Sequence, residues 1–125
     1  PTMRFAEDDN AGQYRIRAYA AGQVTVNDEV LTRSLVVSAE HLIRDWAPQS
    51  FEDLNAEHLH AATLLDPEIL LIGTGARQRL PHPRLLADLQ ARGIGVEVMD
   101  TASACRTYNI LSGEARRVVA ALLMI

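Results

Sequence analysis

The chain has 125 residues, of which 48% are hydrophobic and 22% are charged, and its formal net charge is −4 at pH 7. This size and composition are typical of one folded domain. The net negative charge argues against nucleic-acid binding, because proteins that bind phosphate backbones usually carry a basic stripe. The longest apolar run, residues 118–125, is far shorter than the roughly 20 residues that cross a bilayer, so we expect no membrane insertion.

The first half of the chain predicts antiparallel strands. Residues 14–19 alternate apolar and polar side chains, which is the pattern of a strand with one solvated face. A second strand is expected over residues 24–26 and a third over residues 29–37. Asn27 and Asp28 form the hairpin turn between them, since both residues tolerate positive φ.

Residues 38–46 allow two interpretations. Ser38 could cap a short helix through His41, or the same residues could form a turn into an extended segment over residues 42–46. We favour the extended segment. Pro48 ends either element, because proline interrupts both helices and strands.

The second half of the chain alternates helices and strands. Asn55 starts a helix through its side chain, and each later strand is a short apolar run that stops at small or polar residues. The expected helices run from Asn55 to about residue 65, from Pro83 to a cap at Gly93, and from a cap at Asp100 or Thr101 to Ser112 and Gly113; the expected strands cover residues 69–72, 95–99 and 117–124.

This order of elements predicts an α/β fold. We expect a flexible N-terminal arm over residues 1–12 and a single α/β domain over residues 13–125. Its mixed central sheet would have N-terminal antiparallel hairpins followed by a βαβαβ parallel portion. The carboxyl ends of neighbouring parallel strands share one edge of a sheet, which is where open α/β sheets usually bind ligands.

Gly73-Thr74-Gly75 follows the first of these buried strands and is similar to part of a dinucleotide-binding motif. A third glycine is absent, however, and a polar loop separates Gly75 from the next helix. The start of that helix is therefore not placed against a pyrophosphate. We interpret the two glycines as allowing a sharp exit from the strand and a close approach of the backbone.

A group of polar residues lies in the last helix. Arg106 and Asn109 are three residues apart and therefore on one side of it. Together with Thr74 they could form a small crevice suited to a carboxylate, a phosphate or a peptide carbonyl.

A structural role for these residues is the alternative, and the sequence leaves both open. Asp100 would then satisfy the helix start, Thr107 would bond back to the helix, and Arg106 would pair with a carboxylate. For Glu97 we favour pairing with Arg116 or Arg106 over a role as an acid in the crevice.

Cysteine and histidine give no catalytic or metal-binding pattern. Cys105 is the only cysteine and has no histidine near it in sequence, so we expect a small buried apolar residue and not a nucleophile. His58 and His60 are two apart on a predicted helix and point in different directions, which argues against a shared metal. We expect no catalytic residue, no metal and no cofactor.

Two stretches carry a family resemblance: Ile-Leu-Leu-Ile-Gly-Thr-Gly at residues 69–75 and Arg-Gly-Ile-Gly-Val-Glu-Val-Met-Asp-Thr-Ala-Ser-Ala-Cys-Arg-Thr-Tyr-Asn-Ile-Leu at residues 92–111, followed by Glu114, Arg116 and an apolar close. They resemble a family of small, largely uncharacterised Mth938-like domains. This family includes the mitochondrial NADH dehydrogenase (complex I) assembly factor three and the adipogenesis-associated domain protein. Ala115 departs from the pattern, since the family usually has glycine there.

The resemblance implies a three-layer α/β domain with no established enzymatic activity. The function it implies is a non-catalytic interaction module or an assembly-factor-like module, with a protein partner and a cytoplasmic location. The alternative is a small-molecule-binding protein or an enzyme that uses the polar crevice for a small anionic ligand. The signature residues, which we predict to bind the ligand, are Gly73, Thr74, Gly75, Glu97, Asp100, Arg106, Thr107, Asn109 and Arg116.

Overall fold

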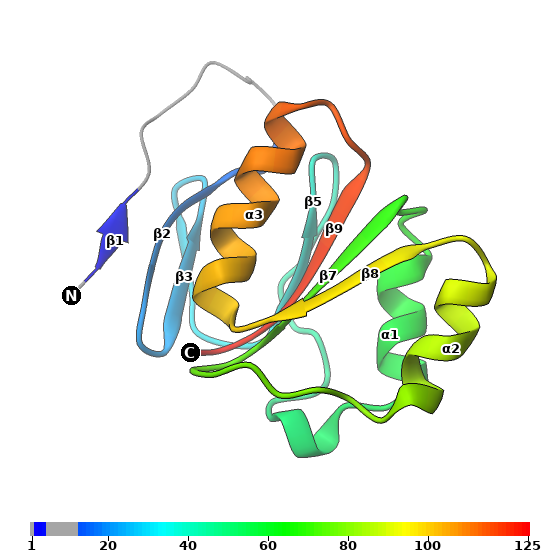
Figure 1. Ribbon diagram of the computed structural model, residues 1–125. Helices are drawn as coiled ribbons and strands as arrows, with labels where there is room; N and C mark the ends of the chain where they lie inside the picture. Colours follow the sequence, from blue (N-terminus) through cyan, green and yellow to red (C-terminus); the bar gives the residue numbers. More distant parts are fainter. Residues whose placement is uncertain (1, 5–12) are drawn as a thin grey trace.

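A computed structural model describes residues 2–4 and 13–125 of the chain, and it has two β-sheets and three α-helices in that part (Figure 1). The N-terminal sheet has the strand order β1-β2-β3-β4, and the central sheet has the order β6-β5-β9-β7-β8. The strands of the N-terminal sheet are β1 (Met3–Arg4), β2 (Ile16–Ala20), β3 (Gln23–Val26) and β4 (Glu29–Leu31). Those of the central sheet are β5 (Leu35–Ser38), β6 (Leu42–Ile43), β7 (Ile69–Thr74), β8 (Gly95–Met99) and β9 (Val118–Leu123). The helices are η1 (Phe51–Asp53, 3-10), α1 (Ala56–Thr63), α2 (Pro83–Ala91) and α3 (Thr101–Gly113).

The central sheet is mixed, as predicted. β7 pairs in parallel with β8 on one side and with β9 on the other. β5 pairs antiparallel with β9, and β6 pairs antiparallel with β5. The order strand, helix, strand, helix, strand from β7 to β9 confirms the predicted βαβαβ portion.

The two faces of the central sheet carry different layers. Side chains along a strand alternate between faces, so Leu122 of β9 packs with α3 and the N-terminal sheet, whereas Leu123 packs with α1 and α2. We call the side of α3 and the N-terminal sheet the first face, and the side of α1 and α2 the second face. Figure 1 shows α3 on one side of the sheet and α1 and α2 on the other. These layers confirm the predicted three-layer α/β domain.

The predicted third strand, residues 29–37, is wrong as one element. β4 ends at Leu31 and β5 begins at Leu35, and the chain passes from the N-terminal sheet to the central sheet between them. Ser34 sits at this crossing, where its carbonyl accepts a hydrogen bond from the Trp46 amide at 3.0 Å. The strand breaks here because residues 29–31 pair in the N-terminal sheet, whereas residues 35–38 pair in the central sheet.

The extended interpretation of the segment after β5 is confirmed, although the strand is shorter than predicted. β6 covers only Leu42–Ile43 of the expected residues 42–46. The turn before it is closed by the Ser38 amide, which donates to the His41 carbonyl at 2.8 Å, and by the Ser38 hydroxyl, which accepts from the His41 amide at 3.1 Å.

Part of the predicted arm is a strand. Met3 and Arg4 form β1 and pair antiparallel with Tyr19 and Ala18 of β2. Residues 1 and 5–12 of the predicted arm lie outside the described residues. None of the helices in the described part is long and apolar enough to cross a membrane.

The predicted helix starts are confirmed at residue level. The Asn55 side chain accepts from the His58 amide at 3.0 Å, while His58 Nδ1 accepts from the Asn55 amide at 3.2 Å, and together they form a capping box. Pro83 is the first residue of α2, and Asp100 caps α3. The first helix ends at Thr63, two residues earlier than expected.

Candidate functional site

The carboxyl ends of β7 and β8 lie at the point where the chain diverges to opposite faces of the central sheet. After β7 the chain leads to α2 on the second face, and after β8 it leads to α3 on the first face. In open α/β sheets such a divergence usually leaves a crevice in which a ligand binds. This edge is the one for which the sequence predicts a site.

Main-chain and hydroxyl groups of the protein fill this divergence point. The Thr101 hydroxyl donates to the Leu123 carbonyl at 2.6 Å and accepts from the Gly75 amide at 2.9 Å. The Thr101 amide donates to the Gly75 carbonyl at 2.9 Å. The start of α3 is thus bonded to the ends of both β7 and β9.

The glycines allow this close approach. A Cβ atom on Gly73 would lie 2.9 Å from Thr101 Oγ1 and 3.1 Å from Thr101 Cα, so no side chain fits there. Gly75 has a φ of +99°, which other residues rarely adopt, and turns the chain out of β7. The interpretation of the two glycines from the sequence is confirmed.

Thr74 holds the loop that follows β7. Its hydroxyl donates to the Arg77 carbonyl at 2.7 Å and accepts from the Arg79 amide at 3.0 Å. The same oxygen lies 3.2 Å from the Met99 carbonyl oxygen at the end of β8. The side chain is buried, and its hydrogen bonds fix the main chain of the two arginines.

Asn109 lies inside the protein, between α3 and the N-terminal sheet. Its Oδ1 accepts from the Ile16 amide at 3.1 Å, and its Nδ2 donates to the Ile16 carbonyl at 2.7 Å. The side chain, only 8% exposed, therefore pairs with β2 as a neighbouring strand would. The crevice that combines Asn109 with Thr74 is not formed.

Arg106 lies on the outer side of α3 in a chain of polar contacts. Its guanidinium donates to the Tyr19 hydroxyl and, at 3.1 Å, to Ser103 Oγ, which in turn donates to Asp100 Oδ2 at 2.8 Å. Asp100 Oδ1 accepts from the Ser103 amide at 2.8 Å and so caps the helix. Burial of Asp100 acts to raise its pKa, but the hydrogen bonds from Ser103 and the charge of Arg106 outweigh burial and lower the pKa.

The remaining predicted residues lie apart from this edge or have other partners. Glu97 is exposed and forms no hydrogen bond or ion pair with any described residue, so its predicted pairing is wrong. Arg116 instead binds Glu68, 3.1 Å from Nε to Oε1, at the opposite end of the parallel strands, and this bond lowers the pKa of Glu68. The Thr107 hydroxyl contacts Met99 Sδ at 3.5 Å instead of bonding back to the helix.

Cys105 is fully buried, as predicted. Burial raises the pKa of its thiol to about 12, so the thiolate needed for nucleophilic attack is scarce near neutral pH. Within residues 2–4 and 13–125 no group of three or more histidine, cysteine, aspartate or glutamate side chains could hold a metal ion.

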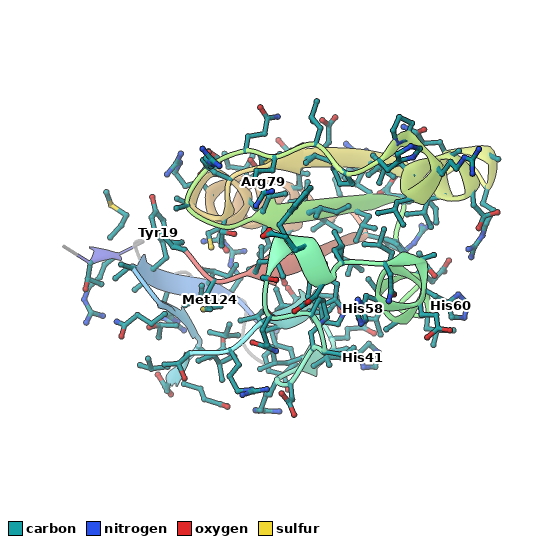
Figure 2. All side chains as sticks on the ribbon, turned by 90° about the horizontal axis from the view of Figure 1, so that it is seen from below. Tyr19, His41, His58, His60, Arg79 and Met124 are labelled. Carbon is teal, nitrogen blue, oxygen red and sulfur yellow. The ribbon has the colours of Figure 1, made fainter. Side chains whose placement is uncertain are left out.

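An open hollow of about 380 Å³ lies beside the filled divergence point, and the sequence did not indicate most of its residues. It lies between the loop after β7, η1 and the residues after β9. Figure 2 looks onto this edge and labels Arg79 and Met124 on it. Its lining includes Ser50, Phe51, Thr74, Arg77, Arg79 and Met124. The sequence feature that could have indicated this hollow is the pair Arg77 and Arg79 in the polar loop that follows Gly75.

The nine predicted ligand-binding residues thus fall into separate groups. Gly73, Thr74, Gly75 and Asp100 lie at the carboxyl edge, with Asp100 as the cap of α3. Arg106 and Thr107 lie further along that helix, Asn109 lies inside the protein, and Glu97 is exposed on β8. Arg116 lines a different hollow, of about 290 Å³, at the opposite end of the parallel strands. Their ligand-binding role stays a prediction.

Comparison with known proteins identifies the class to which this fold belongs. A protein family described as "Protein of unknown function (DUF498/DUF598)" matches residues 16–123, so the chain belongs to this family. A crystal structure of a Bordetella parapertussis protein is similar with a TM-score of 0.86 at 42% identity, over 92% of this chain and 98% of that one. A Bordetella pertussis protein described as an Mth938-like domain is similar with a TM-score of 0.83 at 35% identity, over 98% of this chain and 92% of that one. The resemblance seen in the sequence is confirmed.

Particular relatives have names that refer to assembly. The NADH dehydrogenase [ubiquinone] 1 alpha subcomplex assembly factor 3 of Danio rerio is 46% identical over 83 residues, which are 65% of this chain and 48% of that protein. Its Xenopus tropicalis counterpart is 34% identical over 124 residues, 98% of this chain and 67% of that protein. The matched part is thus about half to two thirds of these relatives. The "13 kDa major membrane protein" of Francisella tularensis is 29% identical over 117 residues, 93% of this chain and 95% of that protein.

Proposed function

We propose that the chain is a non-catalytic, protein-binding module that assists the assembly of an NADH dehydrogenase complex. The observation that carries this proposal is its similarity to relatives named as assembly factors of that complex, with 46% identity over 83 residues in one of them. The contacts of the polar residues support it: Thr101 and Asn109 bind main-chain groups of the protein itself. The partner would be a subunit of the complex or another of its assembly proteins.

The outer side of α3 is the surface on which we place the partner. Ile110 on this helix is 62% exposed, and Arg106 lies one turn before it. Arginine is one of the residues that most often contribute strongly to binding at protein interfaces. Contacts with Tyr19 and Ser103 hold the Arg106 guanidinium, which lowers the entropy lost when a partner binds.

Affinity capture after cross-linking in the cells of its source tests this proposal. The wild-type chain, a double variant with Arg106→Glu and Ile110→Glu, and a control with Arg84→Glu would be compared. Arg84 is an exposed arginine on α2, on the second face. We expect the wild type and the control to enrich the same NADH dehydrogenase subunits, and the double variant to lose most of that enrichment.

Two outcomes would count against different parts of the proposal. If no NADH dehydrogenase subunit were enriched with the wild type, the assembly role would be contradicted. If the double variant captured these subunits as well as the control did, the role would stand and the α3 surface would be excluded. Circular dichroism of the variants would show that the fold is intact.

We also propose a cytoplasmic location without membrane insertion. The proportion of charged residues, 22%, is typical of globular domains and supports the part of this proposal that concerns membrane insertion. Membrane association is the alternative, because the Francisella relative is named a membrane protein. In cell fractionation we expect the chain in the supernatant; a chain that stays in the membrane pellet after a carbonate wash would exclude this proposal.

A further inference from the structure

The hollow at the carboxyl edge has the composition of a small-molecule site. Its volume, about 380 Å³, lies within the range of ligand pockets in proteins. Phe51, Leu123 and Met124 give it an apolar part, and Ser50, Arg77 and Arg79 give it a polar part. Ligand sites typically combine such an apolar lining with a few polar groups that fix orientation.

The positions of both arginines are set by Thr74. Its buried hydroxyl bonds to the Arg77 carbonyl and to the Arg79 amide, so the main chain at each arginine is tied to the end of β7. Gly75, between Thr74 and the arginines, has no room for a side chain without strain: its φ is +99°, and a Cβ would lie 3.2 Å from the Met124 carbonyl oxygen. The main chain of the loop that carries the two arginines is thus held against the end of β7, which favours a defined binding geometry.

The two arginines differ in what already binds them. Arg79 Nη1 lies 3.1 and 2.8 Å from the two carboxylate oxygens of Glu52, and its guanidinium carbon lies 4.4 Å from the centre of the Phe51 ring. Its charge is therefore balanced. Arg77 is exposed and its side chain forms no hydrogen bond or ion pair with any described residue. Arg77 is the cation that an incoming anion can neutralise.

We propose that this hollow binds a small organic acid, a carboxylate carried on a short apolar body. The carboxylate pairs with the Arg77 guanidinium, whose planar N–H groups match the two oxygens of a carboxylate. The apolar body lies against Phe51 and Met124. This site is separate from the α3 surface proposed for a protein partner, so either can be present without the other.

NMR titration of the full, 15N-labelled chain tests the proposal with three probes: sodium hexanoate, hexan-1-ol and inorganic phosphate. We expect hexanoate to shift the amide signals of Gly75, Arg77 and Met124. Hexan-1-ol lacks the charge and phosphate lacks the apolar body. Hexan-1-ol should therefore bind about threefold to fivefold more weakly, the effect expected when one exposed ion pair of up to about 1 kcal/mol is lost. Phosphate should bind more weakly than hexanoate because it buries no apolar surface.

Two arginine variants test whether Arg77 is the residue that pairs with the carboxylate. Arg77→Gln should weaken hexanoate binding by about threefold to fivefold and leave hexan-1-ol binding unchanged, because only the ion pair is removed. Arg84→Gln, an exposed arginine of α2 outside the hollow, is the matched control and should bind hexanoate like the wild type. The unshifted signals of each variant show that it is folded.

Several results would overturn the proposal. Hexanoate that causes no shifts, or shifts elsewhere on the chain, excludes the site. Equal binding by Arg77→Gln and Arg84→Gln excludes Arg77 as the anion partner. Phosphate that binds as tightly as hexanoate excludes the apolar contact. None of these results depends on the capture of a protein partner.

Discussion

Asn109 connects α3 to β2 with both ends of its amide. Replacing it by alanine would leave the buried N–H and C=O of Ile16 without these partners, since the two groups point at the amide. Each unsatisfied buried group costs about 1–3 kcal/mol, so we expect Asn109→Ala to lower the free energy of unfolding by about 2–4 kcal/mol. Urea denaturation measures this difference.

Thr107→Ala is the control for this prediction. Thr107 lies on the same helix, and its hydroxyl makes a weak 3.5 Å contact with Met99 Sδ. We expect a loss of no more than about 0.5–1 kcal/mol. Equal losses in the two variants would contradict the role given to Asn109.

At this scale the sequence predicted contacts between near neighbours and missed those between distant residues. The Asp100 cap could be predicted because its partner, Ser103, is three residues away. The Asn109 contact could not be predicted, because Ile16 is 93 residues away and nothing in the sequence indicates which main-chain groups the Asn109 side chain binds. For the same reason the sequence did not show that Arg116 binds Glu68 and not Glu97.

At the scale of elements, the packing of α3 against β7 depends on the absence of a side chain at Gly73. A methyl group there would lie 2.9 Å from Thr101 Oγ1 and 3.1 Å from Thr101 Cα, and the main chain of α3 would have to move. We expect Gly73→Ala to lower the free energy of unfolding by about 1–3 kcal/mol, as overpacking typically does.

Gly95→Ala on the neighbouring strand β8 is the matched control. Its Cβ would meet the Glu68 carbonyl oxygen at 3.5 Å and Ile69 Cγ1 at 3.8 Å, which are ordinary contacts. We expect no loss of stability for this variant, because alanine also restricts the unfolded chain. Thermal unfolding of both variants gives the comparison, and similar decreases in Tm would refute the steric explanation.

The start of α3 should make stability depend on pH through Asp100. The pKa of Asp100 is lower in the folded chain than its ordinary value, so folding favours the carboxylate. Its contribution is fully present above the unfolded pKa, about 4, and is lost as the pH falls through the lower folded pKa. Asp100→Asn keeps a capping side chain but removes the charge.

We therefore expect Asp100→Asn to be less stable than the wild type at pH 7, by about 0.5–1 kcal/mol from the lost interaction with the helix dipole. This difference should shrink as the pH is lowered from about 4 to 2. Urea denaturation across this pH range measures it. Asp88→Asn is the control, because it changes an exposed side chain in the middle of α2. If the difference in stability between Asp100→Asn and the wild type did not depend on pH, the prediction would be contradicted.

Element boundaries were predictable where a local signal marks them. Asn55, Pro83 and Asp100 begin helices in the sequence as in the structure. The break between β4 and β5 has no such signal, because residues 29–37 contain no proline or glycine. The break follows from a long-range choice, the pairing of β5 with β9, more than 80 residues further along the chain.

At the scale of the whole molecule, the two sheets share one core. The first face of the central sheet packs against β2 and β3 as well as α3, in a cluster that includes Ile16, Val24 and Tyr108. The sequence predicted β2, β3 and the strands β7 to β9, but it did not predict β1 or the division of the strands into two sheets. A hairpin has the same alternating pattern whichever sheet it joins. Because the two sheets share this cluster, unfolding one sheet would expose apolar side chains of the other, so we expect the stabilities of the two sheets to be coupled.

We expect this coupling to make the chain unfold in one cooperative transition, as most single domains of this size do. Trp46, the only tryptophan, is 2% exposed and packs on the second face, so its fluorescence reports the side of α1 and α2. NMR signals of Val24 report the N-terminal sheet on the other side. In urea the two probes should give the same midpoint, and Asn109→Ala should lower both midpoints equally, since β9 supplies side chains to both faces. If the N-terminal sheet unfolded at a lower urea concentration than the surroundings of Trp46, the two sheets would be separate folding units and the coupling through α3 and β9 would be refuted.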